Sequence, residues 1–125
     1  MGKTFLFAPE SYWKLSEEDR KARRCGPGRG VLDWLVPETI LGCSVSAACS
    51  IHDFMYAEGA TAADKDEADC VFLNNMIRLI EAHGGWGWIQ RLRLNRARIY
   101  YEAVSHFGGP AFWNDKNKPT EIGLV

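Results

Sequence analysis

The stretch from Cys49 to Tyr56, Cys-Ser-Ile-His-Asp-Phe-Met-Tyr, constrains this chain more than any other part of the sequence. If it is helical, the residues at relative positions 0, 3, 4 and 7 share one face, and these are Cys49, His52, Asp53 and Tyr56. A stripe that only packs against a core is apolar, whereas this one carries a thiol, an imidazole, a carboxylate and a phenol. Such groups need partners if they are buried. We therefore interpret the stretch as part of an active-site helix.

The composition places this helix in a globular chain of ordinary size. The 125 residues are 46% hydrophobic and 25% charged, which is enough for a modest core without dense crosslinking. We expect a single domain over residues 1–125, with an N-terminal arm at 1–15 and a C-terminal tail at 111–125. The net charge of -1 says nothing about partners, no nucleic-acid partner is expected, and the oligomeric state stays unknown.

The sequence shows neither a membrane-spanning segment nor a secretory signal. No apolar run approaches the ~20 residues that a spanning helix needs. The apolar stretch Thr4 to Ala8 is too short for the core of a signal peptide. The chain is therefore expected to be cytoplasmic as encoded, to have lost a leader, or to be exported by another route.

The predicted fold class is all-α. A hydroxyl followed by acids at Ser16 to Asp19 predicts a short N-terminal helix, which the glycine-rich segment Cys25 to Gly30 ends. The active-site helix is expected from Ser44 to about Glu58. A second long helix, antiparallel to the first, is expected from Thr61 to near His83. A third, amphipathic helix follows from Trp86 or Trp88 to His106.

Hydrophobic periodicity predicts which faces of the long helices are buried. On the second helix, Phe72, Met76 and Leu79 continue a stripe that starts at Asp69, so Asp69 should face the interior. On the third helix, the stripe expected to pack is Trp88, Leu92, Ile99 and Ala103. The side expected in solvent holds Gln90, Arg91, Arg93, Arg96 and Arg98. Contact of these arginines with anionic lipid or nucleic acid is the less favoured alternative.

Two segments between the short helix and the active-site helix have open interpretations. The main-chain groups of the loop Cys25 to Gly30 could point toward a bound ligand, or the loop could form only a turn. The apolar segment Val31 to Leu41 is expected to be a short helix or bend packed on the core, with an exposed interfacial patch as the alternative.

A buried Asp69 would need hydrogen bonds or a positive partner. Two antiparallel helices joined by a short link would bring it toward the face that bears His52. We predict a hydrogen bond between Asp69 and His52, which would fix the imidazole tautomer and leave the other ring nitrogen free as a base. The equally supported alternative is that Asp69 caps the next helix or stays at the rim.

Three motifs together resemble a known family. Cys-x-x-His-Asp-x-x-Tyr at Cys49 to Tyr56, preceded by Cys-Gly-x-Gly at Cys25 to Gly28, resembles the active-site signature of the calcium-dependent secreted phospholipase A2 family. The segment Ala68 to Met76 is similar to the Asp-x-x-Phe segment of the small bacterial and fungal members. The resemblance covers about residues 24–80. It implies a phospholipase A2-like fold and calcium-dependent hydrolysis of a glycerophospholipid acyl ester.

The resemblance also implies a role for each matching residue. His52 would be the general base that activates water, Asp69 would orient His52, and Tyr56 would bind Asp69. Water would attack the ester directly, so no acyl-enzyme forms. The ligands of a Ca²⁺ ion would be the Asp53 carboxylate and the main-chain carbonyls of Arg24, Gly26 and Gly28. The Gly26 N–H and this ion would together stabilise the oxyanion. Cys25 would form a disulfide with Cys49.

The implied partner is a phospholipid membrane surface. The residues proposed for the lipid-facing rim are Trp13, Trp34 and Leu35, flanked by Lys21, Arg23 and Arg29. The sequence departs from the family pattern at several places. The interval between Cys25 and Cys49 is long, Met55 and Ala68 stand where animal members have a bridge, and Cys43 and Cys70 lack assured partners.

Three alternatives to the hydrolase stay open. A zinc site could draw on Cys25, Cys43, Cys49, His52 and Cys70, although the spacings match no finger or ribbon. A cysteine hydrolase could use Cys49 or Cys43 with His52, if nucleophile and base were in contact. The third alternative is a catalytically silent phospholipase-like module that binds lipid or protein.

Overall fold

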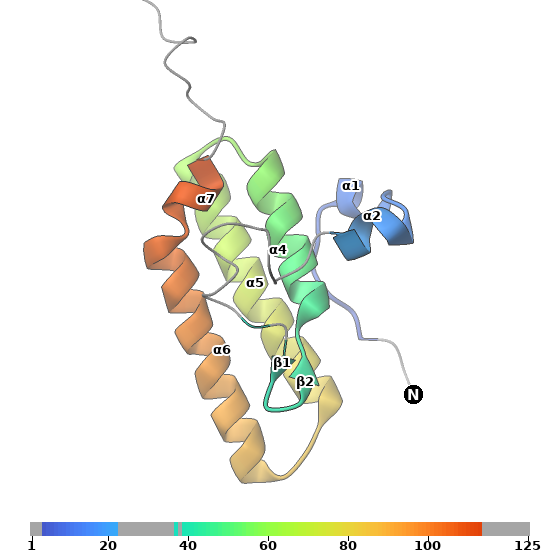
Figure 1. Cartoon of the computed structure of the whole chain (residues 1–125), viewed down its shortest axis with the longest axis vertical. Coiled ribbons are helices and arrows are strands. Elements are labelled where there is room, and N and C mark those ends of the chain that lie inside the picture. Colours follow the sequence, from blue (N-terminus) through green and yellow to red (C-terminus); the bar gives the residue numbers. More distant parts are fainter. Residues whose placement is uncertain (1–3, 23–36, 38, 114–125) are drawn as a thin grey trace, which may run out of the picture.

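The structure is a computed structural model that describes residues 4–22, 37 and 39–113. Its elements, in chain order, are α1 (Glu10–Trp13), α2 (Glu17–Ala22), β1 (Thr39–Ile40), β2 (Cys43–Ser44), α4 (Ser46–Glu58), α5 (Ala62–His83), α6 (Gly87–Phe107) and α7 (Gly109–Trp113). The long helices α4, α5 and α6 lie side by side, while α1 and α2 lie on the other side of α4 from α5 (Figure 1). The prediction of a mostly helical protein with long packed helices is confirmed.

Local signals in the sequence explain where the helices begin and end. Thr61 and Asp64 form a reciprocal cap at the start of α5, because the Thr61 hydroxyl accepts from the Asp64 N–H and the Asp64 carboxylate accepts from the Thr61 N–H. Ser16 caps α2 in the expected way by accepting from the Asp19 N–H at 3.1 Å. The Gly59 N–H donates to the Met55 carbonyl, where α4 ends as predicted.

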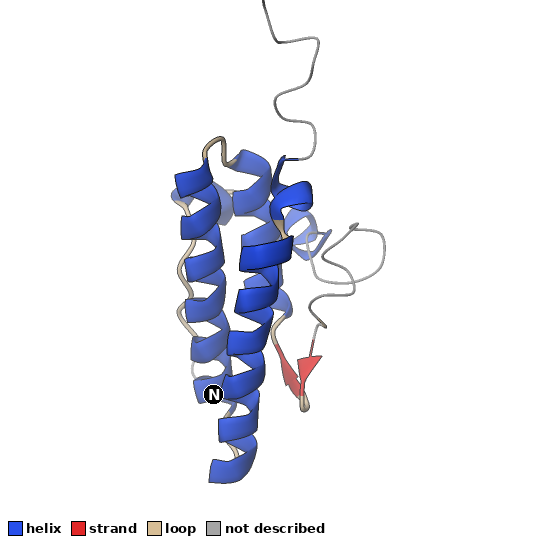
Figure 2. Cartoon of the chain, turned by 90° about the vertical axis from the view of Figure 1, so that its left-hand side faces the viewer, coloured by secondary structure: helices blue, strands red, loops and turns tan. Residues whose placement is uncertain are grey.

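The prediction of an all-α fold was wrong in one respect, because β1 and β2 form a short antiparallel hairpin (Figure 2). Ile40 pairs with Cys43, and the turn between them consists of Leu41 at φ 47° and Gly42 at φ 83°. Two-residue hairpin turns with positive φ at both positions suit the twist of paired strands. Since Ser44 belongs to β2, α4 begins at Ser46 rather than at Ser44.

The apolar segment expected as a helix or bend, Val31 to Leu41, thus ends in a strand and a turn. Residues 31–36 and 38 lie outside the described part of the chain. The predicted helix stop at Cys25 to Gly30 lies outside it as well.

The helix α4 is covered on two sides. Toward α5 and α6, a core forms around Val45, Ala48, Phe72, Met76, Ile80, Ala97 and Val104. Toward the N-terminal arm, Ile51 and Phe54 pack against Tyr12 in a separate cluster. The arm also pairs with α5, since Asn75 exchanges two 2.8 Å hydrogen bonds with the main chain of Phe7. The arm therefore packs on the body of the protein, and it contains the unpredicted helix α1.

The face of α6 that was predicted to pack is largely exposed. Trp88, Leu92 and Ile99 are 63%, 45% and 47% exposed, whereas Arg93 is only 6% exposed. Arg93 is buried because its guanidinium is hydrogen-bonded to main-chain carbonyls. Its guanidinium donates to the Leu41 carbonyl at 2.6 Å and to the Gly84 carbonyl at 2.9 Å, so it ties the hairpin turn and the end of α5 to α6. Arginine suits this position because its planar fork supplies several fixed donors.

The C-terminal tail, predicted to begin at Ala111, is helical as far as Trp113. Phe112 is 1% exposed and its ring packs edge-on against Tyr56, so it anchors the end of the described chain on α4. Residues 114–125 lie outside the described part. Among the described helices, none combines the length and hydropathy that crossing a bilayer requires.

Replacing Arg93 should destabilise the fold strongly. Arg93→Leu removes the donors to Leu41 and Gly84, and we expect the free energy of unfolding to fall by about 2–4 kcal/mol because two partly buried carbonyls lose their partners. Arg91→Leu, at an exposed position of the same helix, should change it by no more than about 0.5 kcal/mol. Urea unfolding followed by circular dichroism measures both, and similar losses in the two variants would contradict this role of Arg93.

Candidate active site

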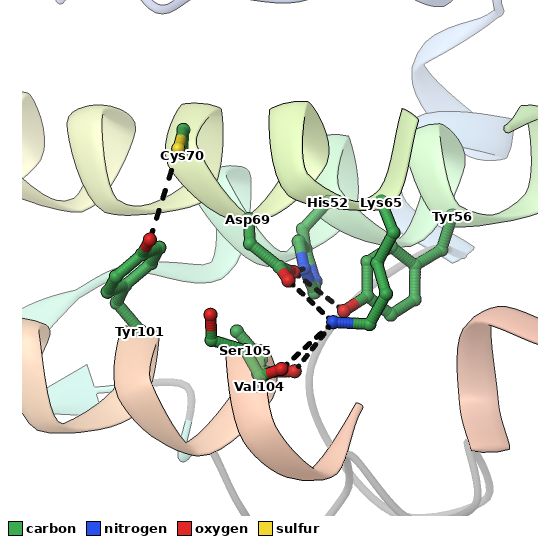
Figure 3. A network of polar contacts seen from close by, with 8 residues as sticks. All are labelled: His52, Tyr56, Lys65, Asp69, Cys70, Tyr101, Val104 and Ser105. Atoms are coloured by element: carbon green, nitrogen blue, oxygen red, sulfur yellow. Dashed lines mark hydrogen bonds and ion pairs between the residues drawn. The ribbon is translucent and has the colours of Figure 1, made fainter. Parts of the chain in front are cut away.

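The predicted contact between His52 and Asp69 is present at the interface of α4 and α5 (Figure 3). The His52 Nε2 atom lies 2.7 Å from the Asp69 Oδ1 atom. Both residues are buried, at 3% and 1% exposure. The alternative, in which Asp69 caps a helix or stays at the rim, was therefore wrong.

The Asp69 carboxylate accepts hydrogen bonds from three side chains. The Tyr56 hydroxyl donates to Oδ1 at 2.6 Å, as predicted, and the Lys65 ammonium donates to Oδ2 at 2.8 Å. Burial by itself would raise the pKa of Asp69, but the hydrogen bonds from His52, Lys65 and Tyr56 outweigh it and lower the pKa. Asp69 is therefore an ionised acceptor in the interior.

The ionised Asp69 determines the tautomer of His52. Because a carboxylate only accepts, the neutral imidazole must carry its hydrogen on Nε2, which leaves a lone pair on Nδ1. Among the described residues, no side chain or main-chain group donates to Nδ1. The ring is held between aromatic neighbours, with Phe72 stacked at 4.5 Å and Tyr56 tilted at 4.1 Å between centroids. Nδ1 thus has the chemistry of a fixed base.

Tyr56 is held as a hydrogen-bond donor. Burial, together with its hydrogen bond to Asp69, raises the pKa of Tyr56 well above its ordinary value, so the phenol stays protonated. The main chain approaches its hydroxyl closely at Gly108. A Cβ atom at Gly108 would lie 2.6 Å from this hydroxyl and would also clash with the Val104 carbonyl. Only glycine fits at this position without a shift of the end of α6.

Lys65 is the member of this network that the sequence analysis missed. Its Nζ atom donates to Asp69 Oδ2 and, at 3.2 Å each, to the carbonyls of Val104 and Ser105 (Figure 3). The three N–H groups of the ammonium are thus all used, and the last turn of α6 is joined to the site. The signal was available, because Lys65 precedes Asp69 by four positions on one helix, a spacing that brings side chains together.

The proposed calcium ligands lie only partly in the described chain. Asp53 is half-buried on α4, one residue beyond His52, whereas Arg24, Gly26 and Gly28 lie outside the described residues. The donors fit the ion in kind, because one carboxylate and three carbonyls are the hard oxygen ligands that Ca²⁺ takes. The described residues contain no cluster of three or more His, Cys, Asp or Glu side chains that could hold a metal.

The cysteines do not support the zinc or thiol alternatives. Cys43 and Cys70 are free, and the single S–H of Cys43 has the carbonyls of Leu79, at 3.7 Å, and Ser44, at 3.9 Å, as alternative acceptors. Burial raises the pKa of Cys43 more than the charge of Arg93 lowers it, which is the opposite of nucleophile activation.

Cys49 is disulfide-bonded and is not a thiol nucleophile. Its predicted partner, Cys25, lies outside the described residues, so the pairing stays a prediction.

Comparisons of the chain with known protein families, with curated proteins and with solved structures found no match. The interpretation of the site therefore depends on its residues and their geometry.

Removing the Lys65 ammonium should destabilise the protein, because it leaves one oxygen of a buried carboxylate without a donor. We expect Lys65→Met to lower the free energy of unfolding by about 3 kcal/mol. Lys14→Met is the matched control, since Lys14 also pairs with an acid four positions away, Glu10, but both side chains are exposed. That exposed pair should contribute no more than about 1 kcal/mol. Equal effects of the two substitutions in urea unfolding would show that Lys65 is not part of a buried network.

The lowered pKa of Asp69 predicts a pH-dependent contribution to stability. A carboxyl with a lower pKa when folded stabilises the protein above its unfolded value of about 3.9, and this contribution is lost as pH falls through the folded pKa. The difference in unfolding free energy between wild type and Asp69→Asn should therefore be large at about pH 5 and shrink below about pH 4. Asp66→Asn, an exposed change on the same helix, should show no such trend, and a constant difference for Asp69→Asn would contradict the assignment.

Proposed function

We propose that this chain is a calcium-dependent hydrolase of the phospholipase A2 type, with a phospholipase A2-like domain, that cleaves an acyl ester of a glycerophospholipid. The observation that supports this most is the buried 2.7 Å contact between His52 Nε2 and Asp69 Oδ1. It leaves Nδ1 as the basic atom of an oriented imidazole. The motif resemblance at Cys25 to Gly28 and Cys49 to Tyr56 supplies the reaction class.

In the proposed mechanism, the neutral His52 acts as a general base toward water. As the water oxygen forms a bond to the ester carbonyl carbon, one of its protons moves to Nδ1. The ionised Asp69 stabilises the resulting imidazolium through Nε2–H, while Lys65 and Tyr56 hold the carboxylate in place. The tetrahedral intermediate then loses its alcohol oxygen, which takes the proton from Nδ1. No covalent bond to the protein forms.

The proposed ion site combines the Asp53 carboxylate with the main-chain carbonyls of Arg24, Gly26 and Gly28. A Ca²⁺ ion bound there would supply positive charge to the carbonyl and phosphate oxygens of the substrate. The Gly26 N–H would donate to the same developing oxyanion.

The proposed partner is a phospholipid surface. Trp13 of the predicted rim is 46% exposed, while the side chain of Lys21 and residues 23–36, which include the rest of that rim, are not described. The outer face of α6 offers a further lipid-contacting surface. It carries the exposed apolar residues Trp88, Leu92 and Ile99, flanked by the exposed arginines Arg91, Arg96 and Arg98. Apolar side chains between cations suit the boundary of an anionic bilayer.

A second candidate function is a silent module that binds lipid without turnover. Two observations favour it: His52 is only 3% exposed, and the exposed face of α6 could bind a membrane without it. The two candidates differ in whether fatty acid is released.

Fatty-acid release from phospholipid vesicles tests the proposal. We expect release with Ca²⁺, loss of release on chelation with EDTA, and recovery when Ca²⁺ is added back. His52→Ala should lower the rate by about 10²–10⁴-fold, because it removes the general base. His106→Ala, a change of an exposed histidine on α6, should leave the rate unchanged.

Release that survives His52→Ala would contradict the proposed mechanism. Calcium-independent release would contradict the proposed ion site. Vesicle binding without release, by wild type and His52→Ala alike, would instead establish the silent module.

A further inference from the structure

A pocket of about 520 Å³ lies between α4 and the N-terminal segment that includes α1 and α2. Neither His52 nor Asp69 lines it, since that pair lies between α4 and α5 (Figure 3). Its walls are mainly apolar and aromatic, and they include Leu6, Tyr12, Trp13, Ala47 and Ile51. The volume falls within the range of small-molecule sites, which are commonly apolar with a few placed polar groups.

Arg20 supplies a placed polar group in this pocket. Its Nε atom is buried and has no hydrogen-bond partner among the described residues. The guanidinium carbon lies 5.9 Å from the centre of the Trp13 ring, which positions the cation against an aromatic face. A buried donor without an acceptor is costly in a folded protein. Because Nε is itself closed off, an acceptor in the pocket would meet the other N–H groups of the Arg20 guanidinium.

The surrounding hydrogen bonds hold Arg20 in place and use the neighbouring hydroxyls. The Ser50 hydroxyl donates to the main-chain carbonyl of Arg20 at 2.6 Å, and the Tyr12 and Ser50 hydroxyls lie 2.8 Å apart. This chain of contacts joins α1, α2 and α4 at the pocket wall. The Arg20 cation is thus presented by a fixed main chain, which lowers the entropic cost of binding a ligand.

We propose that this pocket binds a long-chain carboxylate, of the chemical class of a fatty acid. The carboxylate accepts hydrogen bonds from the terminal N–H groups of the Arg20 guanidinium, and the hydrocarbon chain lies along the apolar wall formed by Leu6, Trp13 and Ile51. A planar guanidinium matches a carboxylate in two-point geometry. The exposed Glu17 also borders the pocket, so a singly charged head group suits it better than a dianionic phosphate.

The site does not depend on the proposed hydrolase function. If the protein does release a fatty acid, its product belongs to the class of ligand that the pocket takes. If it does not, the cavity and the Arg20 cation at its wall still define the same ligand chemistry.

Isothermal titration of the full chain with dodecanoate, below the concentration at which it forms micelles, tests the proposal. We expect saturable binding of one dodecanoate per chain. Arg20→Met should weaken it about tenfold or more, because a charge-assisted hydrogen bond is lost. Arg96→Met makes the same change of charge at an exposed position on α6 and should leave the affinity unchanged. Dodecanol, which has the chain without the charge, should bind wild type at least about tenfold more weakly than dodecanoate.

Two further variants separate this site from the proposed active site. Ala47→Trp places a large ring at the pocket wall from an exposed position and should abolish binding. His52→Ala should retain it. Equal affinity for dodecanoate and dodecanol, equal weakening by the Arg20 and Arg96 changes, unaltered binding by Ala47→Trp, or no saturable binding would overturn the proposal. If Arg20→Met does not fold, the comparison of acid and alcohol on wild type decides the outcome.

Discussion

An ionised carboxylate in an apolar interior is the constraint on which the rest of this structure depends. Asp69 is 1% exposed and would be costly without donors, yet His52, Tyr56 and Lys65 all donate to it. Each donor fixes a different part of the fold. His52 and Tyr56 position α4 against α5, and Lys65 joins α5 to the last carbonyls of α6. The same contacts that satisfy one charge therefore set the relative placement of the long helices.

The Asp69 carboxylate links the stability of the fold to the chemistry of His52. The hydrogen bonds that keep Asp69 ionised also select the tautomer of His52 and leave Nδ1 basic. The aromatic rings of Phe72 and Tyr56 restrict how the imidazole can turn. A base that is held in one orientation before substrate arrives needs little reorganisation during proton transfer. The proposed hydrolase function uses this property, and the silent module would retain it only for packing.

Much of the fold and of the buried pair could be predicted because local rules apply there. The cap at Thr61, the glycine stop at Gly59 and the stripe that includes Asp69 are read directly from short spacings. The hairpin turn at Leu41 was missed because leucine rarely adopts positive φ, and the partner strands are very short. The buried face of α6 was mispredicted because Arg93 is held by carbonyls from distant segments, which periodicity cannot reveal. Lys65 was overlooked although its spacing to Asp69 was visible.

The placement of α4 between two packed surfaces has a consequence for how this sequence can vary. Helices at the edge of a protein usually keep one side on which substitutions are tolerated, but most of α4 lacks such a side. Only Ala47, Ala57 and Glu58 of this helix are exposed, and Ser46, Asp53 and Met55 are half-buried. Evolutionary drift in homologues should therefore be slow along nearly the whole helix, for reasons of packing as well as of chemistry. Invariance of a residue in α4 would by itself say little about whether that residue takes part in a reaction.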